Sequence, residues 1–356
     1  MDKKTFKKHL IEYLETEAMS RREQPVADLI ISRLNKNTPY EISYDGFGSL
    51  ILHKPSKVKN APKFMVCAHM DEVGYLVRII DDNGQILVSP VGGIWASVVI
   101  GTKATLVTRN GKKHFGVFGH TSIHIMEDSK VSKAITNKEL YVDFGFKNKE
   151  EALKAGVEVG DPIYISGETI YFDNPDLVGG KAMDNRGGCM TLEYVAKALE
   201  DIDLDVDLYL VGSVQEEVGE RGAKTAVSVI NPQIAIALDT TTTHDTIGTI
   251  KGMTKLGYGA AIRMMDRDML ANPYLAEFMC SIGKKYKIPH YKFVAEGGGT
   301  DAAMLQYSQG GAATLTISLP QRYLHSPIGV CDINDLIAAG DLIVETIKNI
   351  SKSKIF

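Results

Sequence analysis

Two adjacent carboxylates, Glu216 and Glu217, follow an apolar run, Val206 to Val214, whose length and composition are typical of a buried strand. Two like charges at the mouth of a buried strand disfavour joint ionisation, and a bound cation would relieve the repulsion between them. For such a pair taken alone, a solvated turn is the alternative. A metal site is favoured because other apolar runs in the chain also lead to side chains of the types that bind metals.

Three further apolar runs lead to residues of this kind. Residues 63–68 end at His69, residues 234–238 end at Asp239, and residues 313–318 lead a few positions later to His325. In an open α/β sheet the ligand site lies beyond the carboxyl ends of the strands, so we expect these side chains at one edge. A carboxylate two residues after the first histidine, Asp71, could hold the second ring nitrogen of a ligating imidazole.

A further carboxylate, Asp184, stands at the start of a segment with helical periodicity, which places Met190, Leu192 and Val195 on one apolar face. Aspartate is a good N-cap, so this residue could simply cap the helix. It could equally be a metal ligand at the helix entrance. The local sequence leaves both alternatives open.

Two imidazoles and three carboxylates suit two divalent transition ions that share one bridging carboxylate. In this arrangement one ion takes His69 and Asp239, the other takes Glu217 and His325, and Asp184 bridges them. Glu216 is then left without a metal but next to the site, which makes it the candidate general base.

Other catalytic templates explain fewer of these residues. The chain has no HExxH motif, no GxSxG elbow and no catalytic cysteine context. A glycoside hydrolase could use Glu216 with a second acid, but this alternative leaves His69 and His325 without a role. A non-catalytic metal-binding assembly protein is the alternative from another class, and it gives no role to a free acid beside the ligands.

The 356 residues allow one large or two ordinary domains, and the sequence texture divides them. Residues 75–166 are rich in Val, Ile and Thr with frequent turns, which predicts a small β-barrel or sandwich. This segment interrupts an α/β pattern over residues 1–74 and 167–356, so we expect an inserted domain. Strands are expected within it at residues 85–91, 98–108, 113–118 and 162–165. Its histidines are expected to be surface or structural residues: His114, His120 and His124.

Bulk composition excludes several classes of protein. Lys and Arg number 40 against 44 Asp and Glu, so the net charge of −4 offers no basic footprint for nucleic acid. No stretch approaches a membrane span in length, and the N-terminus lacks a continuous apolar segment, so we expect neither a membrane span nor a signal peptide. The four cysteines are dispersed and predict no disulfide framework. We therefore expect a cytoplasmic protein.

Taken together, these motifs resemble the M42 family of metallo-aminopeptidases, the glutamyl and deblocking aminopeptidase group of the co-catalytic zinc exopeptidases. The matching stretches run in order along nearly the whole chain: residues 68–74, 181–186, 215–219 with 221–223, 238–239, 298–302 and 325–326. Agreement of six spaced motifs is far more specific than one short match. One departure lies in residues 119–124, where many relatives have a proline before the second histidine.

The resemblance implies a zinc-exopeptidase-like, three-layer α/β/α catalytic domain over residues 1–74 and 167–356, interrupted by a β-barrel dimerisation domain over residues 75–166. It implies a dinuclear aminopeptidase with two divalent ions per subunit, zinc first, with cobalt or manganese as alternatives. In this family pattern, His69, Asp184, Glu217, Asp239 and His325 bind metal, Glu216 is the base, and Asp71 orients His69. The substrates would be short peptides with a free N-terminus, and dimers would assemble into a homododecamer. Some relatives carry an endoglucanase label.

The preferred N-terminal residue of the substrate is a separate question. A preference for Glu or Asp needs a cation in the substrate pocket. Five basic residues are candidates: Lys251, Lys255, Arg263, Lys292 and Arg322. Each is also explained as a solvated surface charge, because Lys and Arg are mostly exposed.

Overall fold

The computed structural model describes residues 1–353 and 355 and is built on an eight-stranded sheet. Residues 354 and 356, at the end of the segment predicted to be catalytic, lie outside the described residues. The strands, in their order across the sheet, are β1 (Glu41–Tyr44), β2 (Leu50–Lys54), β12 (Asp207–Ser213), β3 (Lys63–His69), β13 (Ile234–Thr242), β16 (Ala313–Gln321), β14 (Ala260–Met265) and β15 (His290–Val294). The four middle strands run parallel to one another, so their carboxyl ends lie at one edge.

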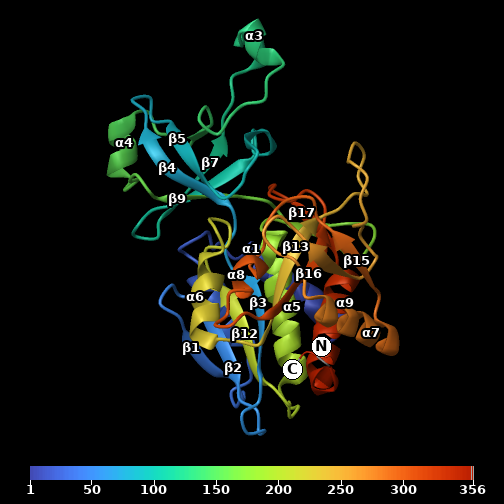
Figure 1. Ribbon diagram of the computed structural model, residues 1–356. Coiled ribbons are helices and arrows are strands. Elements are labelled where there is room, and N and C mark those ends of the chain that lie inside the picture. The colour runs from blue at the N-terminus through green and yellow to red at the C-terminus, as the bar shows by residue number, and fades with distance from the viewer. Residues whose placement is uncertain (354, 356) are drawn as a thin grey trace.

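Helices pack on both faces of this sheet and give three layers (Figure 1). One layer holds α1 (Lys3–Glu15), α2 (Gln24–Arg33), α5 (Met183–Leu199), α7 (Pro273–Tyr286) and α9 (Ile333–Asn349). The other holds α6 (Arg221–Ile230) and the short α8 (Ala302–Leu305). Nearly every residue of β3 and β13 is buried, as strands covered on both faces require. The predicted three-layer α/β/α class is confirmed.

Six further strands close into a barrel beside the sheet (Figure 1). They are β4 (Gly74–Ile80), β5 (Ile86–Val91), β6 (Lys103–Val107), β7 (Lys113–Phe118), β8 (Tyr141–Asp143) and β9 (Pro162–Ile165). The barrel has a core of its own, which includes Tyr75, Ile86 and Phe118. In Figure 1, α3 (Asp128–Val131) lies on a loop that projects away from the barrel, and α4 (Lys149–Lys154) lies at its side. The predicted β-barrel is confirmed.

The remaining elements are short. A small sheet joins β10 (Ile170–Tyr171), β11 (Leu177–Gly180) and β17 (Gly329–Asp332). Single 3-10 turns span Ala96–Val98, Ile123–Ile125 and Ile350–Lys352. Among the helices of residues 1–353 and 355, none combines the length and apolar character needed to cross a membrane.

The strand predicted over residues 98–108 is wrong in its first half, because β6 begins only at Lys103. The chain turns at Gly101, which has a φ of 75°, and the carbonyl of Val99 accepts the amide of Thr102 at 3.0 Å. A tight turn of this kind cannot be recognised in a run of Val, Ile and Thr, because only the glycine signals it.

A buried ion cluster ties the turn after β3 to the start of α5. Glu72 accepts hydrogen bonds from Lys181 at 2.6 and 2.8 Å and from Arg186 at 3.1 Å. None of these side chains is more than 9% exposed. Burial alone would raise the pKa of Glu72, but the two cations hold it below its usual value. Arg186 also donates to the backbone carbonyls of Thr16 and Ala18, so one side chain fixes three segments of the chain.

Replacing Arg186 by leucine is expected to lower the free energy of unfolding by about 3–5 kcal/mol, because Glu72 and the carbonyls would stay buried with fewer partners. Urea unfolding followed by circular dichroism measures the loss. Lys57→Ala is the control, since it breaks an exposed pair with Asp203 and is expected to change little. A loss for Arg186→Leu no larger than that of the control would contradict the prediction.

Candidate active site

The parallel strands bring the residues predicted from the sequence to one edge of the sheet. His69 is the last residue of β3 and pairs in register with Ser213, the last residue of β12. Glu216 and Glu217 follow β12 in a turn, so they lie beside the end of β3. On the other side of β3, Asp239 lies within β13 and not at its end, because this strand continues as far as residue 242.

Asp184 and His325 reach the same edge from a helix start and from a loop. The backbone of Asp184 is not helical, with φ −83° and ψ 108°. The amide of Gly188 is accepted instead by the side chain of Asn185, at 2.9 Å, so Asp184 is not the residue that caps α5. His325 lies beyond β16 with a φ of 52°, and its Nδ1 is 2.6 Å from the carbonyl oxygen of Gly93.

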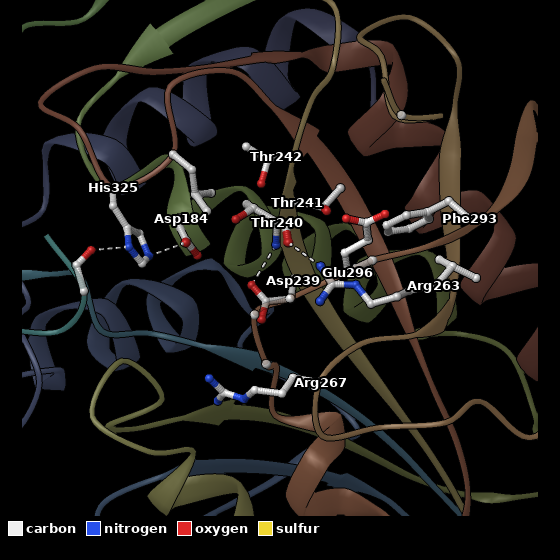
Figure 2. Close-up of a pocket in the computed structure, with 18 of the residues that line it drawn as sticks. Asp184, Asp239, Thr240, Thr241, Thr242, Arg263, Arg267, Phe293, Glu296 and His325 are labelled. Carbon is white, nitrogen blue, oxygen red and sulfur yellow. Dashed lines mark hydrogen bonds and ion pairs between the residues drawn. The ribbon is translucent and has the colours of Figure 1, made fainter. Parts of the chain in front are cut away.

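The two carboxylate oxygens of Asp184 face two different imidazoles. Its Oδ1 is 3.1 Å from Nε2 of His69, and its Oδ2 is 3.1 Å from Nε2 of His325. Asp239 is 3.4 Å from the same atom of His69, and Glu217 is 3.4 Å from the same atom of His325. The five residues predicted as ligands are therefore together, and Asp184 lies between the two pairs, as Figure 2 shows for Asp184, His325 and Asp239.

These side chains fit a pair of divalent ions. Two groups of three side chains can each offer ligand atoms that lie within 4.8 Å of one another. The first group is His69, Asp184 and Asp239, and the second is Asp184, Glu217 and His325. Oε1 of Glu217 is buried and has no hydrogen-bond partner among residues 1–353 and 355, which is costly unless a cation meets it. Imidazole nitrogens with carboxylate oxygens form a donor set that suits several divalent transition ions.

The charges of the cluster are strongly perturbed by burial. Burial raises the pKa of Glu216 well above its usual value, and it raises that of Glu217 to about 6. For Asp184 burial acts in the same direction, but hydrogen bonds from His325 and His69 hold its pKa well below the usual range. Burial lowers the pKa of His325, yet Glu217 and Asp184 raise it to about 12. Despite its burial, the neighbouring carboxylates also raise the pKa of His69, so a metal would compete with protons for both imidazoles.

The sequence profile of the family described as M42 glutamyl aminopeptidase matches residues 48–342. This chain belongs to the M42 family. The resemblance drawn from its motifs is thereby confirmed.

Relatives of this M42 chain match it over almost its full length. The glutamyl aminopeptidase of Lactococcus lactis subsp. cremoris (strain MG1363) is 35% identical over 342 residues, which cover 96% of this chain and 95% of the relative. The structure of aminopeptidase APDkam598 from the archaeon Desulfurococcus kamchatkensis is similar with a TM-score of 0.91 and 34% identity, over 98% of this chain and 95% of that one. The Pyrococcus horikoshii TET1 peptidase, which can assemble into a tetrahedron or a large octahedral shell, is 30% identical with a TM-score of 0.86, over 96% and 99%.

In this M42 chain, Asp71 lies between His69 and the turn after β12 that contains Glu216 and Glu217, here called the glutamate turn. Nδ1 of His69 lies 3.1 Å from the carbonyl oxygen of Asp71 and 3.4 Å from its carboxylate. The same carboxylate accepts the backbone amides of Glu216 at 3.0 Å and Glu217 at 3.3 Å. Asp71 is therefore placed to orient both the imidazole, as predicted, and the turn, which the sequence does not indicate.

A cavity of about 700 Å³ opens over this cluster. Beyond the carboxylates it is lined by Thr240–Thr242, Arg263, Phe293 and the glycine loop Gly297–Gly299 (Figure 2). The histidines of the barrel are absent from the lining: His120 and His124 are exposed, and the ring centre of His114 is 5.4 Å from that of Phe146.

Of the five basic candidates for the substrate pocket, Lys251 and Arg263 line the cavity. The other three have partners elsewhere: Lys255 lies over the ring of Tyr258, Lys292 pairs with Glu277, and Arg322 pairs with Asp245 at 2.7 Å.

Three charged residues of the cavity wall were missed from the sequence: Glu220, Arg267 and Glu296. Glu220 falls between two matched stretches, and the other two belong to loops without a motif, so only their place in the fold reveals them.

Replacing Asp184 by asparagine is expected to remove at least one of two bound ions per chain, because this carboxylate alone faces both imidazoles. Metal analysis after incubation with Zn²⁺ and dialysis counts the ions. Asp128→Asn, in the exposed α3 segment, serves as the control and should keep the wild-type content. Two ions in Asp184→Asn would show that Asp184 is not the shared ligand.

Proposed function

We propose that this chain is a dinuclear metal-dependent aminopeptidase that removes N-terminal residues from short peptides. The observation that carries the proposal is the placement of Asp184 between His69 and His325, with Glu216 next to them. Membership of the M42 family supports the same reaction. The cavity volume of about 700 Å³ suits a small ligand such as a short peptide.

His69 and Asp239 would hold one ion, Glu217 and His325 the other, and Asp184 would contact both. Zinc suits this donor set, and cobalt or manganese would also be accepted. Bound ions of this kind supply Lewis acidity, which lowers the pKa of water and polarises a carbonyl group.

Glu216 would perform the proton transfers. Its Oε2 lies 3.9 Å from Nε2 of His69, too far for a hydrogen bond, so the carboxylate is not committed to the imidazole. Burial beside Asp239 and Glu217 raises its pKa, which makes it a stronger base than an exposed glutamate. It would take a proton from the attacking water and give it to the amine that leaves when the peptide bond breaks.

The two alternatives explain the site less well. A glycoside hydrolase needs a pair of carboxyl groups free to act on a sugar, whereas Asp184 and Glu217 face imidazoles. A non-catalytic metal-binding assembly protein has no use for Glu216. The aminopeptidase reading gives each of these side chains a role.

We also propose that residues 75–166 form a separate domain through which copies of the chain dimerise, and that dimers build a dodecamer. The barrel supports this proposal because it exposes large apolar side chains, among them Trp95, Phe115 and Ile125. The reported assembly of the TET1 relative points in the same direction. A cytoplasmic location stays a prediction.

Replacing Glu216 by glutamine is expected to lower kcat by about 100-fold or more, because the amide cannot take a proton. Hydrolysis of leucine p-nitroanilide measures kcat, and metal analysis should find the wild-type ion content. Glu127→Gln, at an exposed position before α3, is the matched control. Near-normal kcat in Glu216→Gln would remove this residue from its proposed role. Cellodextrin cleavage that survives a chelator would favour the glycosidase alternative.

A preference for acidic N-terminal residues would be carried by Lys251. Arg263 also lines the cavity, but its guanidinium donates to Asp266 at 3.2 Å and to the carbonyl of Thr240 at 3.2 Å, and it is 4% exposed. Its charge is therefore already balanced. Lys251 is exposed in the cavity wall and has no ion pair among the described residues, so it can meet a substrate carboxylate.

Lys251→Ala is expected to lower kcat/KM for a glutamyl anilide by about 2- to 5-fold relative to a leucyl anilide, the range of an exposed ion pair. Lys255→Ala, four residues away and outside the cavity wall, should leave the ratio unchanged. Equal rates for glutamyl, leucyl and lysyl anilides in the wild type would rule out an acidic preference altogether.

A further inference from the structure

The segment between α1 and α2 packs beneath the turn that carries the two glutamates. It contains Ser20 and Glu23, which are 9% and 5% exposed. Neither residue lines the cavity, and neither belongs to a motif of the sequence. Each nevertheless makes a hydrogen bond to the turn or to the carboxylate that holds it.

The turn has a backbone conformation that its residue types do not favour. Gln215 has a φ of 57°, in the left-handed region, which costs a non-glycine residue about 1–2 kcal/mol. Its carbonyl accepts the amide of Arg221 at 3.2 Å, and the carbonyl of Glu216 accepts that of Gly219 at 2.9 Å. These bonds close the turn, but they leave the amide N–H groups of residues 215–217 in need of acceptors.

Two buried carboxylates accept those three amides. Oε1 of Glu23 accepts the N–H of Gln215 at 3.0 Å. Asp71 accepts the N–H groups of Glu216 at 3.0 Å and Glu217 at 3.3 Å. Successive N–H groups beside a left-handed residue form a concavity that binds anions, and here its acceptors are two carboxyl groups of the chain itself.

The segment from Ser20 to Glu23 supports both carboxylates. The hydroxyl of Ser20 donates to Oδ2 of Asp71 at 2.6 Å, and the N–H of Arg21 donates to Oε1 of Glu23 at 2.8 Å. One of the two carboxylates that fix the turn, Glu23, therefore comes from a segment 192 residues earlier in the chain, and Ser20 of the same segment supports the other, Asp71.

We propose that Glu23 is a positioning residue for the metal centre and for the general base. By fixing the amide of Gln215, it sets the direction in which the chain presents Glu217 to the ions and Glu216 to the substrate. Ser20 acts in the same way through Asp71. The catalytic consequence rests on the proposed function, whereas the consequence for metal binding does not.

If Glu23 only stabilised the fold, its loss would lower stability and leave metal binding unchanged. Asp45 is the matched control for that outcome. Asp45 is 8% exposed, and its carboxylate accepts the amides of Phe47, Gly48 and Ser49 in the β1–β2 turn. Loss of this acceptor would cost stability without reaching the metal centre.

The test compares Glu23→Ala and Glu23→Gln with Asp45→Ala in the full chain. Titration with Co²⁺, followed by visible absorption, gives the Kd and the spectrum of the bound ion, and kcat and KM are then measured at saturating Co²⁺. In Glu23→Ala we expect about 10-fold weaker Co²⁺ binding with a changed spectrum, and kcat lower by about 10-fold with KM nearly constant. Glu23→Gln keeps the Oε1 acceptor and should recover most of both, and Asp45→Ala should change neither.

Wild-type Co²⁺ affinity and spectrum in Glu23→Ala would overturn the proposal, and so would a loss that Asp45→Ala shares. If Glu23→Ala does not fold, Ser20→Ala replaces it, since this change removes only the hydroxyl on Asp71. About 3-fold weaker Co²⁺ binding is then expected, and unchanged binding would overturn the proposal. A wild-type chain that binds Co²⁺ but hydrolyses no peptide would contradict the proposed function. The comparison of Co²⁺ binding between the variants and the wild type would still be valid.

Discussion

Repulsion between buried carboxylates is the constraint on which the rest of the structure depends. Asp184, Glu216, Glu217 and Asp239 share one site at the end of the sheet, and each faces one or both of two imidazoles. Two unit charges 4 Å apart repel by about 4 kcal/mol at the effective dielectric of a protein site. Protons on the imidazoles offset part of this repulsion, and two divalent ions would offset it more completely. The site is therefore built for cations, and the chain must be rigid enough to hold it open for them.

That rigidity comes from buried ionic and polar groups close in sequence to the proposed ligands. Arg186 lies two residues after Asp184, and Glu72 lies three residues after His69, so the ion pair between Arg186 and Glu72 connects two of the segments that form the centre. Arg186 also holds the segment after α1 through backbone carbonyls. The same segment supplies Glu23 to the glutamate turn. The segment between α1 and α2, which contributes no proposed ligand, thus helps to define the site.

The sequence was sufficient to predict that the proposed ligand side chains lie close together, because periodicity and strand ends are local signals. His69 and Asp239 belong to continuous apolar runs, and parallel pairing of those runs must bring them to one edge. His325 was harder to place from physics alone, because it follows a loop in which Tyr323 and His325 itself adopt left-handed conformations. The prediction for that residue rested on an apolar run that ends several positions earlier, and the family resemblance supported it.

Other features could not be read from the sequence, because they depend on contacts between distant segments. The bond between Glu23 and the amide of Gln215 joins a side chain to a backbone group, which leaves no pattern of residue types. Whether Lys251 faces the cavity depends on the path of a loop that has no periodicity, and the pairing of Lys292, in β15, with Glu277 depends on how β15 packs beside α7. The alternative in which Asp184 caps α5 was locally as good as the ligand alternative. It fails because the side chain of Asn185 accepts the amide of Gly188, while the carboxylate of Asp184 lies between His69 and His325.

The paired-ion centre is tested most directly by anomalous diffraction at the zinc absorption edge, from crystals of the wild-type chain grown with Zn²⁺. The account predicts two anomalous peaks per chain, one within about 2.0–2.2 Å of ligand atoms of His69 and Asp239 and the other equally close to Glu217 and His325. Asp184 should contact both peaks, and Glu216 neither. A single peak, or two peaks that do not share Asp184, would contradict it.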